Sequence, residues 1–460
     1  MKRNFTELSY NSSTELVFGV AKNPIEMSNG MVIGGGEVYP EINFTLPPIT
    51  INKESMPEVI EQYKQMINGV CKRAVELYSP GIVVEIELLP EMTVNPQWGI
   101  EVCKIVREIM YEYESKYQLK SVMRITPNDT RDMVRPPKMR TGSYVDRMFE
   151  TFEGCARSGA EFLSIESTGG KEINDDALLN GDIKKVILAL GILGVRDMEY
   201  LWGRIIDIAN TTGAYPAGDS ACGFANTAMV LADKGFIPKV FSAVVRVASV
   251  PRSLVAFEMG AIGPSKDCAY EGLYIKTIAG IPISIEGKTS ACAHLSPIGN
   301  ITMAMADLWS NESVQNIKLL SDMAPTVYTE QLIYDCRLLN VAGKNREDAL
   351  RLRDWLVESD SKFDPQAYVL RPDVIYTISK ELVKIESNFS RTKLAVQLAI
   401  NILRKAYEEG KVNISPREIR WLDLMNIQLE DIPDDEEKFW HEIKDELDMS
   451  KFNPKEYGLT

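Results

Sequence analysis

The stretch Gly218-Asp-Ser-Ala-Cys-Gly-Phe-Ala-Asn226 (GDSACGFAN) gives a starting point for the whole chain. A short strand is expected before it, over residues 213–219, and an apolar helical run follows at residues 227–232. A thiol near the first turn of a helix faces the positive end of the helix dipole, which favours the thiolate. Cys222 is therefore a candidate metal ligand or nucleophile at a strand-to-helix turn.

Two further stretches end an apolar strand with a residue that can bind a metal. FLSIESTGG, residues 162–170, carries Glu166, and GAIGPSKDC, residues 260–268, carries Cys268. Two thiolates and one carboxylate suit zinc, and three protein ligands leave a fourth position open, as in catalytic sites. The spacing is too wide for a zinc finger. The alternative is that Cys222 and Cys268 are ordinary buried residues and that Glu166 pairs with a basic side chain.

Strands alternate with helices through most of the chain, which is typical of parallel βαβ units. The ends of parallel strands meet on one face of a barrel, so we expect an α/β fold: a (β/α)8 TIM barrel with additional helical segments, mainly C-terminal. A doubly wound open sheet is the alternative. Strands are expected at residues 81–88, 121–126, 161–167, 213–219, 261–262, 281–286 and 326–329, with one ambiguous stretch at 31–44.

The chain divides near residue 340. Residues 1–340 are expected to form the TIM-barrel catalytic domain with an N-terminal extension, and residues 341–460 a helical cap or docking region. Helices are expected there at residues 345–358, 372–387, 391–409 and 431–448. The acidic run DIPDDEEKFW is more typical of a solvated face than of a partner patch.

Composition excludes several classes of protein. The 460 residues carry a net charge of −14, which argues against binding to nucleic acid or to an anionic membrane. Two histidines are too few for a His-based metal site or a Ser-His-Asp triad. Seven cysteines without a disulfide pattern indicate the reducing cytoplasm. No secretory signal is evident, and no stretch is expected to be long and apolar enough to span a bilayer. Four cysteines are expected to be inert helix residues: Cys71, Cys103, Cys155 and Cys336.

Three long stretches, residues 218–272, 281–300 and 307–340, resemble the zinc-containing methyltransferase subunit of methanol:corrinoid methyltransferases. The resemblance is close in the central part of the chain and looser at both ends. In that family, the zinc ligands are a Glu on a barrel strand and two Cys in the GDxACGFAN and GPSKDCAYEG stretches. The resemblance therefore implies that Glu166, Cys222 and Cys268 bind zinc, and none of the three is substituted here.

The resemblance also implies the reaction. The methyl group of methanol is transferred to the cob(I)amide of a separate corrinoid protein, giving methylcobamide and water, in the one-carbon metabolism of methanogenesis or acetogenesis. Hydroxide is a poor leaving group, so a Lewis acid is needed at the oxygen. The chain has no Asp-x-His-x-x-Gly segment to ligate cobalt. A corrinoid-binding partner is therefore expected, with a homodimer of this chain inside a heterotetramer.

A proton must also reach the departing oxygen. Asp219, Lys266 and Asp267 are close to the ligands in sequence and could donate it or orient the ligands. Glu286 and Lys288, near a later strand end, are further candidates. The alternative for each of these side chains is an ordinary salt bridge at the pocket rim.

Two other functions remain open at this point. One is methyl transfer from another donor, such as a methylated amine or a methoxyaromatic ether. The other is a non-catalytic scaffold with structural zinc, in which Cys292 or His294 completes a closed shell.

Overall fold

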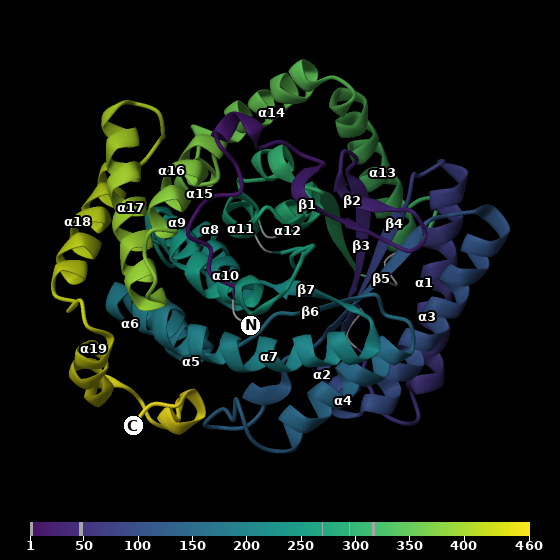
Figure 1. Cartoon of the computed structure of the whole chain (residues 1–460), viewed down its shortest axis with the longest axis horizontal. Helices are drawn as coiled ribbons and strands as arrows, with labels where there is room; N and C mark the ends of the chain where they lie inside the picture. The colour runs from purple at the N-terminus through teal and green to yellow at the C-terminus, as the bar shows by residue number, and fades with distance from the viewer. Residues whose placement is uncertain (1–2, 46–48, 269, 294, 315–317) are drawn as a thin grey trace.

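A curled parallel sheet forms the centre of the chain in a computed structural model that describes residues 3–45, 49–268, 270–293, 295–314 and 318–460 (Figure 1). Its seven strands follow the order β7-β6-β5-β4-β3-β9-β8. A separate antiparallel pair, β1 (Val20–Glu26) and β2 (Val32–Gly35), precedes it. The seven strands are β3 (Tyr39–Thr45), β4 (Ile82–Leu88), β5 (Ser121–Pro127), β6 (Phe162–Ile165), β7 (Tyr215–Asp219), β8 (Ser284–Glu286) and β9 (Leu308–Val314).

An irregular segment, residues 261–267, lies between the two edge strands. On one side, the Ile262 and Gly263 amides donate to the carbonyls of Pro216 and Ala217 in β7, at 2.9 Å each. On the other side, the Glu286 amide of β8 donates to the Asp267 carbonyl at 2.6 Å. The segment thus occupies the place of a further barrel strand between β7 and β8. The strands follow one another around the axis in chain order, which confirms the TIM-barrel expectation over the open-sheet alternative.

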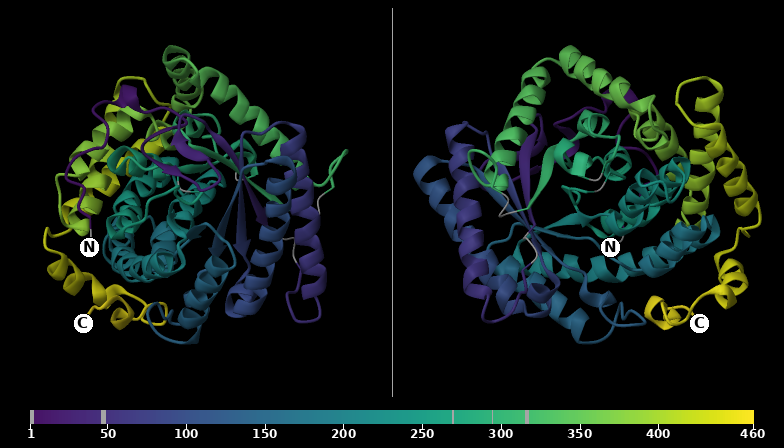
Figure 2. Two further views of the ribbon diagram at one scale, coloured as in Figure 1. Left: turned by 45° about the vertical axis from the view of Figure 1, so that its right-hand side comes forward. Right: turned by 180° about the vertical axis from the view of Figure 1, so that it is seen from behind.

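Helices surround the sheet (Figure 2). In α1 (Met56–Glu76), the buried residues Val59, Tyr63, Ile67 and Val70 recur every three or four positions, so one face of the helix packs on the sheet. The others up to residue 343 are α2 (Pro90–Val94), α3 (Pro96–Tyr117), α4 (Ser143–Arg157), α5 (Lys171–Asn180), α6 (Ile183–Leu188), α7 (Val195–Thr212), α8 (Thr227–Asp233), α9 (Lys239–Ala248), α10 (Val250–Met259), α11 (Gly272–Ala279), α12 (Lys288–Ala293) and α13 (Ala324–Gly343).

The C-terminal part is helical, as expected, and wraps around the outside of the barrel (Figure 1). Side-chain caps begin several of its helices, because Asn345, Ser387, Ser415 and Asp435 each accept a bond from a first-turn amide. The helices are α14 (Arg346–Ser361), α15 (Pro365–Tyr368), α16 (Pro372–Leu382), α17 (Asn388–Glu408), α18 (Pro416–Glu430) and α19 (Glu436–Ile443).

Two strand predictions were wrong. Residues 326–329 (TVYT) lie in α13, because Pro325 in the first turn favours a helix start. Residues 261–262 bond to β7 but continue into Pro264, which has no amide hydrogen to extend the ladder. Neither β9 nor α18 was predicted.

The expectation about apolar stretches also needs correction. Residues 239–259, spanning α9 and α10, are long and apolar enough to cross a membrane, with a mean hydropathy of 1.5. An 18-residue window of this stretch is entirely buried, so the stretch forms part of the core. The four cysteines expected in helices are indeed buried there: Cys71, Cys103, Cys155 and Cys336.

Candidate metal centre

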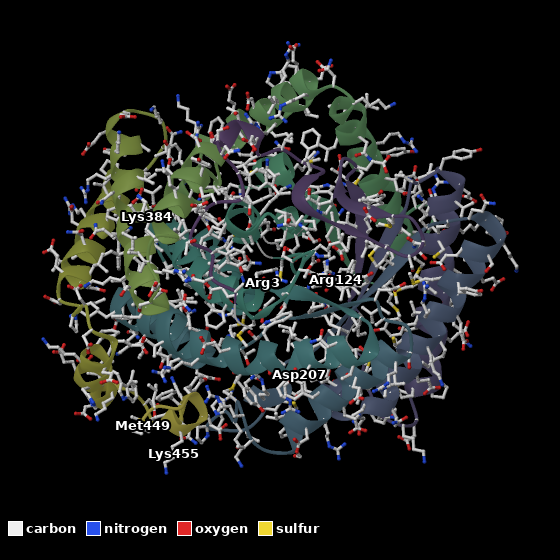
Figure 3. All side chains as sticks on the ribbon, in the orientation of Figure 1. Arg3, Arg124, Asp207, Lys384, Met449 and Lys455 are labelled. Atoms are coloured by element: carbon white, nitrogen blue, oxygen red, sulfur yellow. The ribbon has the colours of Figure 1, made fainter. Side chains whose placement is uncertain are left out.

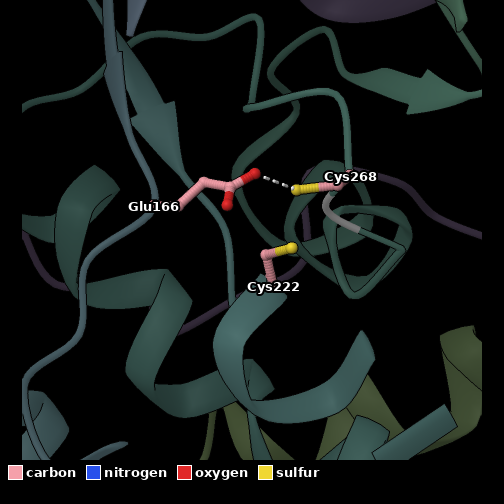
Figure 4. A group of neighbouring side chains, drawn as sticks. All are labelled: Glu166, Cys222 and Cys268. Atoms are coloured by element: carbon pink, nitrogen blue, oxygen red, sulfur yellow. Dashed lines mark hydrogen bonds between the residues drawn. The ribbon is translucent and has the colours of Figure 1, made fainter. Parts of the chain in front are cut away.

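Three neighbouring strand positions bring the expected ligands together (Figure 4). Glu166 directly follows β6. Cys222 follows β7 and begins a π-helical turn, Cys222–Asn226, that leads into α8. Cys268 directly follows the irregular segment 261–267, which lies beside β8. One ligand atom from each residue lies within 4.8 Å of the other two. Residues separated by more than a hundred positions therefore form one compact group of two sulfurs and a carboxylate.

Hydrogen bonds hold this group in place. The Cys268 thiol donates to Glu166 Oε1 at 2.8 Å. The Asn226 amide nitrogen lies 3.8 Å from Cys222 Sγ and donates to the Cys268 carbonyl at 3.1 Å. Arg246 in turn donates to the Asn226 amide oxygen at 2.7 Å. Asn226, the last residue of GDSACGFAN, thus connects the two cysteine-bearing turns.

Both thiols favour their protonated form in the metal-free site. The bond with Cys268 lowers the pKa of Cys222, but burial and the Glu166 charge outweigh it and raise that pKa to about 12. Burial also raises the pKa of Cys268 well above its ordinary value. The helix dipole alone therefore does not produce the thiolate that we expected. A bound divalent cation reverses this balance, because its charge favours the thiolates.

Lys266 lies at the centre of a carboxylate cluster. Its ammonium is 3.0 Å from Glu85, 2.7 Å from Glu87 and 3.4 Å from Glu166, and it also bonds to Asp267. Burial lowers the pKa of Lys266, but the carboxylates, Asp267 first, raise it more, so Lys266 stays charged. Glu166 thus has both a basic partner and a cysteine partner, and the salt-bridge alternative does not exclude the metal-site interpretation.

Asp219 holds the two turns that carry Glu166 and Cys222 through hydrogen bonds. Its Oδ1 accepts bonds from the amides of Ser167, at 3.3 Å, and Ser220, at 2.6 Å. Its Oδ2 accepts a bond from the Trp202 indole at 3.1 Å. Ser167 follows Glu166 and Ser220 precedes Cys222, so this buried carboxylate orients both ligand-bearing turns.

The other proton-donor candidates differ in their surroundings. Asp267 accepts from Ser310 at 2.8 Å and from Asn43 at 3.3 Å, besides its contact with Lys266. Glu286 is buried, which raises its pKa well above the ordinary value, and it accepts from the Tyr270 hydroxyl at 3.1 Å. Lys288 pairs with Asp335 at 3.2 Å. His294 and the side chain of Cys292 lie outside the described residues.

A cavity of about 310 Å³ opens beside Glu166 and Cys222. Its wall combines apolar side chains, including Phe44 and Leu88, with Asp129, Asp132 and Lys171. Burial raises the pKa of Asp132 to about 6. Two of the three proposed ligands, Glu166 and Cys222, thus face an accessible space rather than a closed protein shell.

Sequence analysis missed several residues that shape this site. Glu85 and Glu87 alternate with apolar residues in IVVEIEL, and this two-residue period could have indicated a charged barrel interior. Arg124 of the neighbouring strand β5 lies near the centre of the molecule (Figure 3) and bonds to Glu41 at 2.7 Å. Asp129 follows that strand and binds the Thr168 amide at 2.8 Å.

Comparison with known proteins identifies the family. The model of the methanol-cobalamin methyltransferase B subunit matches residues 2–458. The chain belongs to this family. The methanol--corrinoid protein co-methyltransferase of Methanosarcina barkeri (strain Fusaro / DSM 804) is 38% identical over 465 residues, covering 99% of both proteins. The crystal structure of the methanol:cobalamin methyltransferase complex MtaBC from Methanosarcina barkeri contains a chain with a TM-score of 0.93 and 37% identity, covering 99% of this chain and 100% of that one.

Family membership confirms the resemblance noted in the central stretches and extends it to both ends of the chain. The protein is a methyltransferase with a TIM-barrel fold.

Proposed function

We propose that methyl transfer from methanol to a corrinoid protein, the reaction of this family, takes place at a zinc ion held by Glu166, Cys222 and Cys268. The observation that supports this is the convergence of the three ligand atoms within 4.8 Å beside a cavity. Two sulfurs and a carboxylate oxygen fit zinc, and three ligands leave room for the substrate. The adjoining cavity favours this catalytic arrangement over a structural zinc scaffold.

Bound zinc supplies a Lewis acid that weakens the carbon–oxygen bond of methanol. In the overall reaction this bond breaks, the methyl group joins the reduced cobalt of the corrinoid, and the oxygen leaves with a proton as water. The residues of the chain prepare the site for this exchange. Lys266 offsets part of the negative charge around Glu166, and the apolar wall formed by Phe44 and Leu88 limits access of water.

The hydrogen bonds favour different roles for the proton-donor candidates. Asp219 is occupied by the amides of the two ligand turns, so we assign it a positioning role. Asp267 is held by Ser310 and Lys266, and we assign it the same role. Glu286 remains a candidate proton donor for two reasons. Burial raises the pKa of its carboxyl group and so favours the protonated form, and a carboxyl oxygen lies within 4.8 Å of Cys268 Sγ.

We further propose that the corrinoid arrives on a separate protein, with two copies of each chain in the complex. A corrinoid is bulky and must approach the site from the open, C-terminal face of the barrel. All six cysteines whose side chains the structure describes are free, which supports a cytoplasmic location. The net charge of −14 supports the absence of nucleic-acid binding.

The test combines metal analysis with the complete reaction. Incubation with zinc, methanol and a reduced corrinoid protein should produce the absorbance of methylcobamide, with about one zinc per chain. Glu166→Gln, Cys222→Ala and Cys268→Ala should each lose zinc and activity. Cys336→Ala, which changes a buried cysteine of α13, is the matched control and should keep both. Stoichiometric zinc in all three ligand variants would show that the ligands are assigned wrongly.

A further inference from the structure

The C-terminal segment, residues 453–460, reaches the loop that carries Glu166. Tyr457 is buried, and its hydroxyl accepts a hydrogen bond from the Gly170 amide at 3.0 Å. Gly170 is the last residue of the loop 166–170, directly before α5. The end of the chain is thus bonded to the turn that follows a proposed metal ligand.

Each residue of this loop after Glu166 has its own restraint. The Ser167 carbonyl accepts from Arg252 at 2.9 Å, and the Thr168 amide donates to Asp129 at 2.8 Å. Gly169 packs so closely on Asp197 that a Cβ atom there would lie 2.3 Å from its Oδ2. The Tyr457 hydroxyl restrains the fourth residue, Gly170. This loop is therefore held by side chains from several distant parts of the chain.

The C-terminal segment is itself firmly attached. Glu456 accepts bonds from the Arg140 amide and the Thr141 hydroxyl, both at 2.7 Å. The rings of Phe452 and Tyr457 lie 5.3 Å apart, between centroids. Just before the segment, Lys451 bonds to Asp176 of α5 at 2.8 Å. The segment lies beneath α5 and α7 at the lower edge of the molecule, near the labelled Lys455 (Figures 1 and 3).

We propose that Tyr457 is a positioning residue of the methyl-transfer site, which fixes the geometry of Glu166 through its bond to Gly170. This inference rests on the proposed function of Glu166 as a metal ligand. The Gly170 amide is buried, and a buried amide without a partner is costly. Without the hydroxyl, the loop must shift until this amide reaches water, and Glu166 shifts with it.

Tyr457→Phe tests this directly, since it removes one hydroxyl and keeps the ring. Hydrogen exchange on the metal-free protein should be roughly fivefold faster in the peptide covering residues 166–175, the effect of one lost hydrogen bond. The zinc dissociation constant should rise by a similar factor, and the absorption bands of the cobalt(II)-substituted protein should shift. Tyr274→Phe is the matched control. It removes another buried hydroxyl, one that donates to the Val369 carbonyl, and it should leave all three measurements unchanged.

Wild-type exchange and wild-type zinc affinity in Tyr457→Phe would overturn the proposal, as would equal changes in Tyr274→Phe. If Tyr457→Phe does not fold, Glu456→Gln weakens the second anchor of the segment and should give a smaller change in the same peptide. No change there also overturns it. If Glu166→Gln keeps zinc, the proposed ligand set fails, while hydrogen exchange still shows whether Tyr457 holds the loop.

Discussion

Lys266 illustrates how a single side chain can hold a charged barrel interior together. Its ammonium contacts Glu85, Glu87, Glu166 and Asp267, and Lys266 itself is fully buried. Ion pairs of this kind add little net stability, but removing one partner leaves the other charges buried without compensation. The main effect of the lysine is therefore to reduce the electrostatic repulsion among these neighbouring carboxylates.

Lys266→Met should lower the free energy of unfolding of the metal-free protein by about 3–5 kcal/mol. The loss should be larger at pH 8 than at pH 5, because the carboxylates left without Lys266 repel each other only when ionised. Denaturant titration measures both values. The control is Lys288→Met, which removes a partly exposed ion pair with Asp335 and should cost about 0–1 kcal/mol. Equal losses in the two variants would contradict this account.

Zinc affinity should fall as the pH falls. The pKa of Cys222 is raised to about 12 in the metal-free site and that of Cys268 also lies above its ordinary value, so both thiols are protonated at neutral pH. Binding must then release two protons, and affinity should drop by up to roughly 100-fold per pH unit. Competition with a chelator between pH 6 and 8 measures the slope. A flat profile would argue against thiolate ligands.

At the level of elements, regular strands and helices could be predicted from their periodicity. β4 alternates apolar with charged residues after the turn residues 79–81, and β5 is a short, mainly apolar run, so their bounds were found within about one residue. The ligand-bearing turns were found through cysteine and glutamate at strand ends. Their closeness in space could be inferred because parallel strands end on the same face of a barrel.

Other elements could not be predicted, for identifiable reasons. The sequence of β9, LWSNESV, is too polar to indicate a buried strand. Its Ser310 hydroxyl donates to Asp267 inside the barrel, where apolar residues were expected. The β-branched run TVYT suggested a strand, but Pro325 and its packing make it helical. The residues that restrain the Glu166 loop come from α7, α10 and the C-terminal segment. Contacts between such distant parts of the chain cannot be predicted from a local sequence pattern.

Gly169→Ala should perturb the loop between β6 and α5. Its new methyl group would overlap Asp197, which Arg131 holds at 2.7 and 2.9 Å and which cannot move away freely. We expect destabilisation of about 1–3 kcal/mol and weaker zinc binding. In Gly203→Ala, the new methyl group of α7 meets only Met259 at 3.6 Å, so stability should stay equal or rise. Thermal unfolding and zinc titration of the two variants compare them.

At the scale of the whole molecule, the helical layer from α14 to α19 covers the outside of the barrel, and the cavity beside Glu166 remains accessible (Figure 1). This division is consistent with our proposal that a corrinoid-bearing partner approaches the C-terminal face of the barrel. The cavity is larger than methanol needs, which is consistent with the approach of a second, bulky group.

The chain alone should not retain a corrinoid during purification, and it should form a stable complex when the corrinoid protein is added. Lys171→Ala, at the cavity wall, should weaken that complex by up to about tenfold, because rim charges steer association. Lys384→Ala changes an exposed lysine that does not line the cavity, and it should leave the complex unchanged. Analytical ultracentrifugation measures both. Stoichiometric corrinoid on the isolated chain, or turnover without any corrinoid, would refute the need for a partner.

The bond between Tyr457 and Gly170 joins residues 287 positions apart. Because a ribosome delivers the chain from its N-terminus, residues 453–460 emerge after all three proposed metal ligands have left the exit tunnel. On our proposal for Tyr457, the loop of Glu166 reaches its final shape only after this segment has been made, so metal loading should follow the synthesis of residues 453–460. The same order bears on protein production. The Trp440 indole donates a hydrogen bond to the Thr460 carbonyl at 3.1 Å. A tag fused after Thr460 would therefore be expected to disturb the segment that carries Tyr457.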